Sequence, residues 1–426
     1  MSDPSTPLRV CIDARLVSGE RGGVEQVVIG LASGLSRLDD GDERYMFLVD
    51  RGHTAWLEPF VFGPSSLLKA GPVSGGSGRG GVMGRLRGVA KAAVPAPVRT
   101  AIRGHLPAPE GLPESDGTIE RAGTDVLHFP MQVGFRTSIP SIFAPQDLQH
   151  LHLPQFFSRD EIARRERTYR ALCQRAAVVT VMSSWGRDDI VARYGLAPEK
   201  VLIVPGAPAL EAYKSPTEGD LAATRDRFGL RDPFALYPAK GWPHKNHLRL
   251  VAALKLLRER GIDVPVVLTG AQGGFEAPIL AEAEALGVSD LVHFVGYVSP
   301  NELSALYRMA RLMIFPSLFE GWGLPVVEAM LAGVPVACSN ATCLPDVTGG
   351  AAELFDPSST PAIADAIAKV WQDDRLRERL VSAGRTRAAL FSWSQSARIF
   401  RAAYRKLGAR GLSAEDRALL AAPPIA

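Results

Sequence analysis

The sequence predicts an α/β protein built from two doubly wound, Rossmann-like domains that face each other across a cleft. Short β-rich apolar runs alternate with amphipathic helical stretches over most of the chain. Several of these runs are almost continuously apolar, which is typical of parallel strands that are covered on both faces. The length of 426 residues suits two cores of about 200 residues better than a single core.

The expected elements fall into two series of five strands with helices between them. The first series of strands is Arg9–Asp13, Tyr45–Val49, Asp125–Phe129, Ala177–Val181 and Val201–Val204. The second series is Phe234–Tyr237, Val264–Leu268, Leu291–Val295, Leu312–Phe315 and Val334–Ala337. Helices are expected at Val24–Leu38, His247–Arg260, Ala277–Leu286, Pro361–Trp371 and Ser394–Lys406.

A stretch that contains proline and glycine separates the two series. Pro205-Gly206-Ala207-Pro208 follows the last strand of the first series, and a polar segment lies near Ala209–Glu218. Such residues interrupt helices and strands, as an interdomain hinge requires. We therefore expect an N-terminal domain at residues 1–212 and a C-terminal domain at 213–393. Residues 394–426 are expected to form a helical segment that packs back on the N-terminal domain.

The composition is that of a soluble globular protein, with 46% hydrophobic and 22% charged residues. The net charge of +3 does not call for a nucleic-acid partner. The four cysteines form no C-x-x-C pair, and we expect them to be buried, reduced thiols in a cytoplasmic protein. Met1–Pro7 lacks the apolar core of a signal peptide. No run approaches the ~18 apolar residues of a membrane span, so any membrane contact is expected to be peripheral, at the inner face.

One segment, residues 71–123, breaks the alternation of strands and helices. It is rich in glycine and proline, and between residues 79 and 103 it carries six cations with no acid among them. These are Arg79, Arg85, Arg87, Lys91, Arg99 and Arg103. The segment is interpreted either as a solvated insertion or as a basic surface that meets an anionic lipid or an anionic acceptor.

The strongest functional signal is the segment Phe319–Met330, which follows the expected strand Leu312–Phe315. Its glycine loop, Glu320-Gly321-Trp322-Gly323-Leu324, leads into a helix whose first turn holds Pro325. The free N–H groups of a helix N-terminus favour a phosphate. Glu320 and Glu328 can then reach hydroxyls of a sugar and of a ribose. The alternative is an ordinary surface acid followed by an acid in the first part of a helix.

A second signal is the lysine loop, residues 240–246, which contains Lys240 and Lys245 and follows the strand Phe234–Tyr237. In an open α/β sheet, ligands bind at the carboxyl ends of the strands. Fixed cations there lower the barrier to departure of a diphosphate, which gains charge as it leaves. Asn246 is expected to cap the following helix. The alternative is a pair of solvated lysines on an exposed loop.

These two segments resemble the donor-binding half of the retaining glycosyltransferases of family 4, the glycosyl transferases of group 1, which have the GT-B fold. Segment Ser317–Met330 resembles the E-x7-E motif of that family, with Glu320 and Glu328 as the two acids. The lysine loop resembles the family's basic diphosphate loop, in which Arg or Gln usually stands at the position of Lys240.

The resemblance extends over nearly all of Phe234–Pro357. It implies a nucleobase site at Tyr297 and Val298, and phosphate contacts from Gly321, Trp322, Gly323 and Leu324. It also reaches Leu344-Pro345-Asp346, where the family commonly has Glu in place of Asp346.

The N-terminal half resembles the family more loosely. The pair Gly22-Gly23 resembles the glycine loop that faces donor phosphates and acceptor, and His128 is expected near the cleft. Gln146-Asp147 resembles the family's His-Asp turn, but Gln146 replaces the usual histidine and cannot carry a proton at pH 7. His150 and His152 are interpreted as solvated loop histidines.

The resemblance implies transfer of a hexose, with mannose as one candidate, from a GDP- or UDP-sugar to a glycan or lipid-linked acceptor. It implies retention of anomeric configuration and no cofactor beyond the donor. Asp40-Gly41-Asp42 has the D-x-D pattern of a metal site but is interpreted as a solvated turn, so no metal is expected. A sugar-nucleotide epimerase and a catalytically weak scaffold of the same fold remain alternatives.

Overall fold

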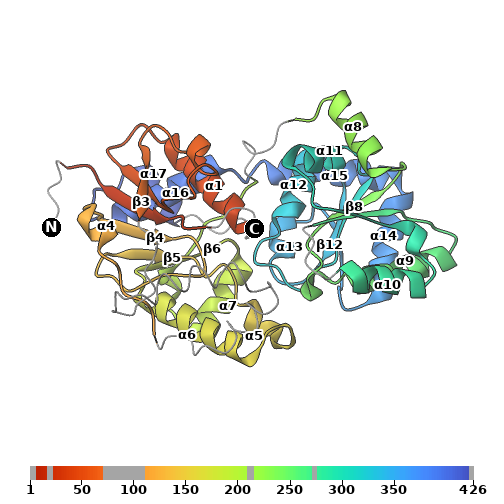
Figure 1. Ribbon diagram of the computed structural model, residues 1–426, viewed down its shortest axis with the longest axis horizontal. Helices are drawn as coiled ribbons and strands as arrows, with labels where there is room; N and C mark the ends of the chain where they lie inside the picture. Colours follow the sequence, from red (N-terminus) through yellow and green to blue (C-terminus); the bar gives the residue numbers. More distant parts are fainter. Residues whose placement is uncertain (1–5, 17–22, 71–110, 209–214, 271–275, 422–426) are drawn as a thin grey trace, which may run out of the picture.

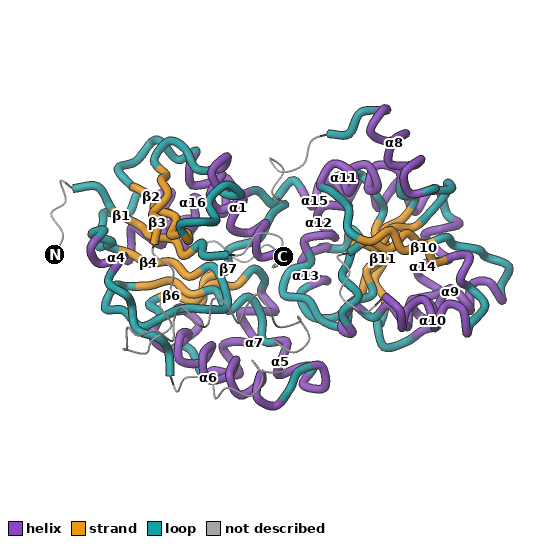
Figure 2. Tube along the Cα trace, viewed as in Figure 1, coloured by secondary structure: helices purple, strands orange, loops and turns teal. Residues whose placement is uncertain are grey.

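The computed structural model describes residues 6–16, 23–70, 111–208, 215–270 and 276–421. Over these ranges the chain forms two parallel α/β sheets, which lie side by side along the long axis of the molecule (Figure 1). The strands of each sheet lie at the centre of a domain, with helices outside them (Figure 2). The predicted doubly wound α/β class is confirmed. Gly22 and the six cations between Arg79 and Arg103 lie outside the described residues.

In the described part of the chain, the N-terminal sheet has seven parallel strands in the order β3-β2-β1-β4-β5-β6-β7. The strand order changes direction between β1 and β4, which in open α/β sheets is where ligands bind. The strands are β1 (Arg9–Asp13), β2 (Arg44–Asp50), β3 (Ser65–Ala70), β4 (Val126–Phe129), β5 (Ser141–Phe143), β6 (Val178–Val181) and β7 (Val201–Ile203).

Helices cover both faces of the N-terminal sheet. They are α1 (Gly23–Ser36), α4 (Thr118–Arg121), α5 (Gln149–His152), α6 (Arg159–Arg175), α7 (Ser184–Tyr194), α16 (Trp393–Leu407) and α17 (Ala414–Ala421). Successive residues of a strand point to opposite faces. Thus Val10 and Ile12 of β1 join a core that includes Leu31 of α1, whereas Cys11 packs in a second core with Leu172 of α6.

The C-terminal sheet contains, over the described ranges, six parallel strands in the order β10-β9-β8-β11-β12-β13. They are β8 (Ala235–Pro238), β9 (Val266–Thr269), β10 (Val292–Gly296), β11 (Leu312–Phe315), β12 (Val336–Ser339) and β13 (Glu353–Phe355). The helices are α8 (Glu218–Phe228), α9 (His247–Glu259), α10 (Glu276–Ala285), α11 (Pro300–Met309), α12 (Leu324–Ala332), α13 (Leu344–Thr348), α14 (Thr360–Gln372) and α15 (Asp374–Ala388).

After α15 the chain crosses back to the N-terminal sheet, where α16 packs against α1 (Figure 1). The close packing depends on Gly30 of α1, because a Cβ at that position would lie 1.9 Å from Trp393 Nε1. Ser396 donates a hydrogen bond of 2.6 Å to the carbonyl of Pro205, and Arg401 forms an ion pair with Asp40. Polar and ionic contacts therefore reinforce the packing of the returning helix.

The expectation of five strands in each series was wrong, because β3, β5 and β13 were not expected. β5 has only three residues and lies between Pro140 and Pro145. So short a strand shows no alternation of apolar and polar residues. β3 and β13 lie at the edges of their sheets and alternate irregularly between buried and exposed positions.

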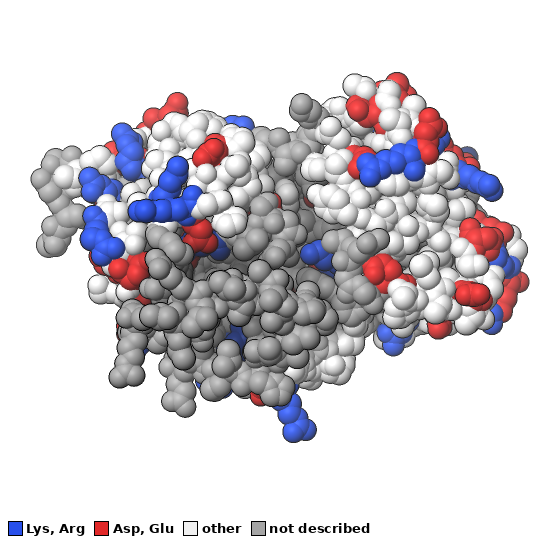
Figure 3. Space-filling view, in the orientation of Figure 1, with Lys and Arg blue, Asp and Glu red and all other residues white. Residues whose placement is uncertain are grey.

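Three findings concern the surface, the thiols and the length of the apolar helices. On the face shown in Figure 3, acidic and basic side chains are interspersed over the C-terminal domain. All four cysteines are free and buried, as expected. Among the described residues, no helix is both long enough and apolar enough to cross a membrane.

Candidate active site

The glycine loop lies at the carboxyl end of β11 and ends at the N-terminus of α12. Gly323, at the N-cap position, has a φ of 89°, a left-handed conformation that favours glycine. A Cβ at Gly321 would lie 3.2 Å from the carbonyl oxygen of Gln146 and 3.3 Å from the Asp147 carboxylate. The absence of a side chain at Gly321 therefore lets the N-terminal domain approach the glycine loop closely.

Lys245 and Glu320 form an ion pair in this region. Lys245 Nζ donates to Glu320 Oε1 at 2.5 Å, and the two side chains are only 15% and 12% exposed. The backbone of Glu320 is held on both sides by one hydroxyl. Its N–H donates to Thr342 Oγ1 at 3.1 Å, and its carbonyl accepts from the same hydroxyl at 2.9 Å. The structure thus brings together the two charged residues that the sequence singled out most clearly.

The lysine loop is fixed to its surroundings by hydrogen bonds. Tyr237 donates to the Lys245 carbonyl at 2.6 Å, and the N–H of Leu318 donates to the His244 carbonyl at 2.8 Å. Burial, together with the charge of Lys245, lowers the pKa of His244 to about 3, so this ring is neutral at pH 7. These contacts hold the lysine loop against the chain that follows β11.

Asn246 does not cap α9 as expected. Its φ is 65°, and its side chain makes no cap hydrogen bond. Its amide donates instead to the carbonyls of Pro316 and Pro357, at 3.0 and 2.8 Å. The side chain therefore joins three loops at the same edge of the sheet rather than satisfying its own helix.

Lys240 occupies a different environment from Lys245. Its Nζ lies 5.3 Å from the centroid of the exposed Trp242 ring, a cation–π arrangement. Among the residues that the structure describes, Lys240 forms no ion pair with a carboxylate. Lys245 is accordingly the cation that faces Glu320, and Lys240 lies against an aromatic ring at the start of the same loop.

Glu328 and the predicted nucleobase residues lie on neighbouring elements of the C-terminal domain. Glu328 of α12 accepts a hydrogen bond of 2.9 Å from Tyr307 of α11. Tyr297 and Val298 follow β10; Tyr297 is 70% exposed, and Val298 packs partly against the core. Tyr307 was missed by the sequence analysis, because only the fold brings α11 beside α12.

The N-terminal domain contributes Gln146 and Asp147, which follow β5. Gln146 has a φ of 67°, and its amide donates to the Pro130 carbonyl at 2.7 Å. Burial raises the pKa of the Asp147 carboxyl above its usual value. The N–H of Gln149 and the charges of Arg165 and Lys245 act in the opposite direction, and Glu320 raises the pKa further. Asp147 is therefore electrostatically coupled to both members of the ion pair in the other domain.

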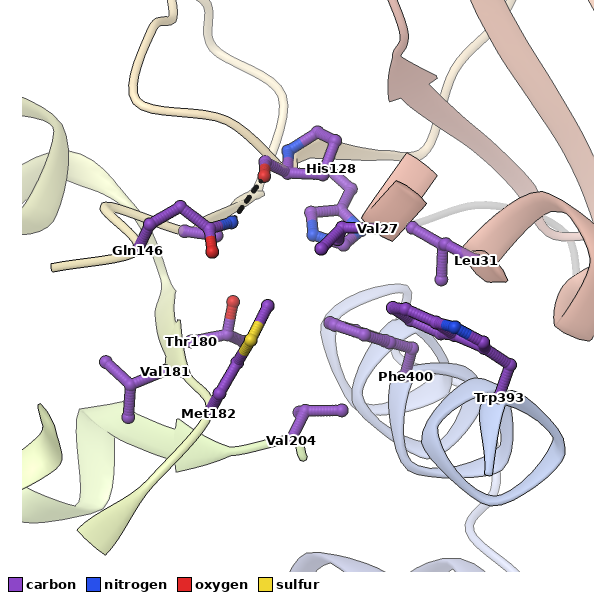
Figure 4. Close-up of a pocket in the computed structure, with 12 residues that line it drawn as sticks. Val27, Leu31, His128, Gln146, Thr180, Val181, Met182, Val204, Trp393 and Phe400 are labelled. Atoms are coloured by element: carbon purple, nitrogen blue, oxygen red, sulfur yellow. Dashed lines mark hydrogen bonds between the residues drawn. The ribbon is translucent and has the colours of Figure 1, made fainter. Parts of the chain in front are cut away.

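A pocket lies at the carboxyl ends of β4, β5, β6 and β7, with Gln146 on one side and α16 on the other (Figure 4). Its walls are mainly apolar and include Leu31, Met182 and Phe400. His128 also lines it, but this residue is fully buried, and its Nδ1 lies 2.7 Å from the hydroxyl of Tyr404. Burial lowers the pKa of His128 to about 3, so the ring contributes no charge.

The interpretation of His150 and His152 as solvated loop histidines was wrong. Both lie on α5, and His150 is completely buried. Its Nε2 is 2.9 Å from Glu166, and Nε2 of His152 is 2.9 Å from Asp189. Their partners are on α6 and α7, so spacing along the chain gave no signal of these contacts.

Two further predicted positions have simpler surroundings. Gly23 is the exposed first residue of α1, and no atom of the described residues lies within 4 Å of the position of a Cβ. Asp40 of the D-x-D pattern pairs with Arg401 of α16, whose hydrogen bond is the main reason that the pKa of Asp40 is lowered. The ion pair gives Asp40 a role in attaching the C-terminal helix.

Comparison with known proteins agrees with this geometry. Residues 224–387 match the family described as glycosyl transferases group 1. The matched residues make up most of the C-terminal domain, which is called the group 1 domain below. The Lys245–Glu320 pair, the glycine loop and Glu328 all lie within this group 1 domain, whereas Gln146 and Asp147 lie outside it.

Curated relatives extend the similarity beyond the group 1 domain. The chain is 30% identical over 263 residues to O-antigen chain mannosyltransferase B of Escherichia coli, covering 58% of this chain and 65% of that protein. It is 33% identical over 233 residues to MMP alpha-(1->4)-mannosyltransferase of Mycolicibacterium hassiacum, covering 54% of each. The matches thus span between half and two thirds of these relatives.

The solved structures cover almost the whole chain. HepE of Anabaena in complex with UDP and glucose superimposes with a TM-score of 0.67 and 18% identity, over 94% of this chain and 100% of that one. At this identity the likeness shows the fold. Together with the two parallel sheets, it shows that the group 1 domain is one half of a GT-B fold.

Proposed function

We propose that this protein is a retaining glycosyltransferase that moves a hexose from a nucleotide sugar to a glycan or lipid-linked acceptor. The observation that carries the proposal is the Lys245–Glu320 ion pair, 2.5 Å long, beside the N-terminus of α12 in a group 1 domain. Mannose is the sugar favoured by the two mannosyltransferase relatives. The donor nucleotide is GDP or UDP.

In this reaction the bond between the anomeric carbon and the diphosphate oxygen breaks, and the acceptor oxygen bonds to the anomeric carbon on the same face. The acceptor proton leaves with the departing phosphate. Lys245 turns from Glu320 toward the diphosphate and stabilises its growing charge, assisted by Lys240 and the amides of Gly321–Leu324. Glu320, released from Lys245, orients hydroxyls of the donor sugar.

The remaining residues bind the rest of the two substrates. Glu328, held by Tyr307, accepts hydrogen bonds from the ribose hydroxyls, and Tyr297 and Val298 contact the nucleobase. Gln146 and Asp147 face the sugar from the acceptor side. Gln146 contributes hydrogen bonds without changing its charge.

Transfer is proposed to be independent of metal, because the lysines and the helix N-terminus supply the positive charge that a metal would otherwise provide. The test is turnover in EDTA. Loss of turnover in EDTA that is restored by Mn²⁺ or Mg²⁺ contradicts this part of the proposal.

Nucleotide sugars and product analysis test the function directly. A thermal-shift panel of UDP-, GDP- and ADP-sugars identifies the donor, because a ligand that binds only the folded state raises the apparent melting temperature. Incubation of that donor with and without glycan acceptors then separates the candidates. A glycosyltransferase forms a new glycoside only when acceptor is present. An epimerase converts the donor into an isomer without one, and a scaffold that binds the donor but forms neither product contradicts the proposal.

A further inference from the structure

An aromatic side chain of the C-terminal domain is inserted into the N-terminal domain immediately before Glu320. Phe319 is only 2% exposed. Its ring centroid lies 5.1 Å from that of His152 and 5.5 Å from that of Trp185, against which it packs edge-on. His152 and Trp185 also contact each other, at 5.3 Å. The three rings form one cluster across the domain interface.

A carboxylate of the C-terminal domain reaches the same place. Asp346 of α13 accepts a hydrogen bond of 3.0 Å from the backbone N–H of Trp185, in the first turn of α7. Ser183, the N-cap residue of α7, accepts from Gly186. One free N–H group of α7 is thus satisfied by its own cap and another by the opposite domain. A negative charge at this end of a helix is stabilising.

Both partners in this contact are connected to the proposed reacting groups. On the C-terminal side, Thr342 bonds to the backbone N–H and carbonyl of Glu320, and α13 with Asp346 begins two residues after Thr342. Arg387 fixes α13 by donating hydrogen bonds to the carbonyls of Asp346 and Val347. A displacement of Asp346 is therefore transmitted to Glu320.

On the N-terminal side, His152 connects the aromatic cluster to Asp147. Nε2 of His152 donates to Asp189 on α7 at 2.9 Å, and its Nδ1 faces Arg193. His152 ends α5, the helix that begins after Asp147, and the Asp147 carboxylate accepts from the N–H of Gln149 on the same helix. The position of α7 and that of Asp147 are thus linked through α5.

We propose that Asp346 and Phe319 are positioning residues, which dock the C-terminal domain on His152, Trp185 and the N-terminus of α7 and so hold Glu320 opposite Asp147. The proposal rests on the proposed function, since it concerns alignment of that site. The docking contacts exist only while the domains are together, so they favour the arrangement in which both halves of the site meet. The nucleotide sugar would bind between the domains, and neither Asp346 nor Phe319 needs to contact it.

The test uses the full-length protein with Asp346→Ala. We expect release of GDP from GDP-mannose, or of UDP from UDP-glucose, with water as the acceptor, to fall about fivefold to tenfold, because losing one helix-capping contact commonly shifts an equilibrium by that factor. The affinity for GDP or UDP alone should be unchanged. The radius of gyration in small-angle X-ray scattering should increase. Asp346→Glu, which keeps a carboxylate, should recover most of the lost rate.

Two further variants make the result specific. Phe319→Ala removes the ring and should act in the same direction as Asp346→Ala, which also covers the case that one of them fails to fold. Asp365→Ala breaks an exposed ion pair with Arg260 within the C-terminal domain and should change neither rate nor radius. If Asp346→Ala and Phe319→Ala leave rate and radius at wild-type values, or lose nucleotide affinity in parallel with rate, the docking role is wrong. If the wild type forms no glycoside with any tested donor and acceptor, the proposed function fails, and the scattering comparison still decides whether the contact holds the domains together.

Discussion

Lys245 and Glu320 neutralise each other's charge at the domain interface. Both side chains are largely buried. Removal of one partner would therefore leave an uncompensated charge, which is costly. A diphosphate is a better partner for Lys245 than a single carboxylate, because it carries more charge and several acceptor oxygens. Under the proposed function, we therefore expect Lys245 to exchange Glu320 for the diphosphate of the donor.

The first prediction is that Lys245→Ala lowers kcat by about 10²–10³, the usual effect of removing one preorganised donor from a developing charge. Steady-state rates at saturating donor measure the change. Lys255→Ala, which removes an exposed lysine of α9 paired with Glu259, serves as the control and should leave kcat unchanged. A loss smaller than about tenfold for Lys245→Ala contradicts its role at the leaving group.

The second prediction concerns Asp147, whose raised pKa lowers the stability of the folded protein at neutral pH. A carboxyl with a raised folded-state pKa favours folding below its unfolded pKa of about 3.9, and this advantage is lost as the pH rises through the folded value. Asp147→Asn should therefore raise the melting temperature at pH 7 while reducing turnover. The difference in melting temperature should shrink toward pH 4. A variant that is less stable than the wild type at pH 7 contradicts this account.

At the residue scale, sequence analysis singled out groups in two contiguous segments with a specific pattern. Lys245 and Glu320 lie on strand-to-helix connections, and Glu328 lies on α12. The contacts of Phe319 and Asp346 with the other domain left no such pattern in the sequence, because His152 and Trp185 lie far away along the chain. Only folding brings these rings together.

At the element scale, α14 and α16 have an apolar face that predicts a core helix, whereas α6 is dominated by charged residues and was not singled out. α6 (Arg159–Arg175) buries only Tyr169, Leu172 and Cys173, and most of its remaining positions are charged, including six arginines. A segment of this composition does not stand out as a core helix. Its stability comes from its contacts with the sheet and from the Ser158 N-cap, which accepts from Glu161.

A largely buried cation, Arg405, also contributes to the attachment of α16. Arg405 pairs with Glu43 at 2.5 Å and with Asp416 at 3.0 Å, and these carboxylates are 1% and 2% exposed. Burial opposes the charge of Arg405, but the two carboxylates outweigh it and raise its pKa. The arginine thus connects the start of β2, α16 and α17 through a single guanidinium.

The third prediction is that Arg405→Met lowers the free energy of unfolding by about 3–5 kcal/mol, because it leaves two buried carboxylates without their cation. Urea unfolding followed by circular dichroism measures the loss. The matched control is Arg398→Met on the same helix. Arg398 pairs with Glu415 at 3.7 Å, but both side chains are more than half exposed. That change should cost less than about 1 kcal/mol. Equal losses for the two variants contradict the importance of burial.

At the scale of the whole molecule, the two sheets were predictable from the alternation of strands and helices, but the contacts between the domains were not. The strand order and the edge at which the loops gather follow from general rules of α/β folds. The approach of Gly321 to Gln146 and Asp147 depends instead on the shapes of two separately folded surfaces. Such complementarity produces no repeating pattern of apolar residues in the sequence.

The last prediction concerns how the whole protein reaches its acceptor. We expect the six cations between Arg79 and Arg103 to hold it loosely on anionic lipid, since each cation near such a surface contributes about 1 kcal/mol, and salt screens the attraction. Wild type should sediment with anionic vesicles at low salt and much less at high salt. Changing Arg85, Arg87 and Lys91 to Ser should reduce the bound fraction without altering the donor KM. Changing Lys255 and Lys369, which form exposed ion pairs in the C-terminal domain, should not. Binding that is indifferent to lipid charge and to the first set of substitutions contradicts the proposal.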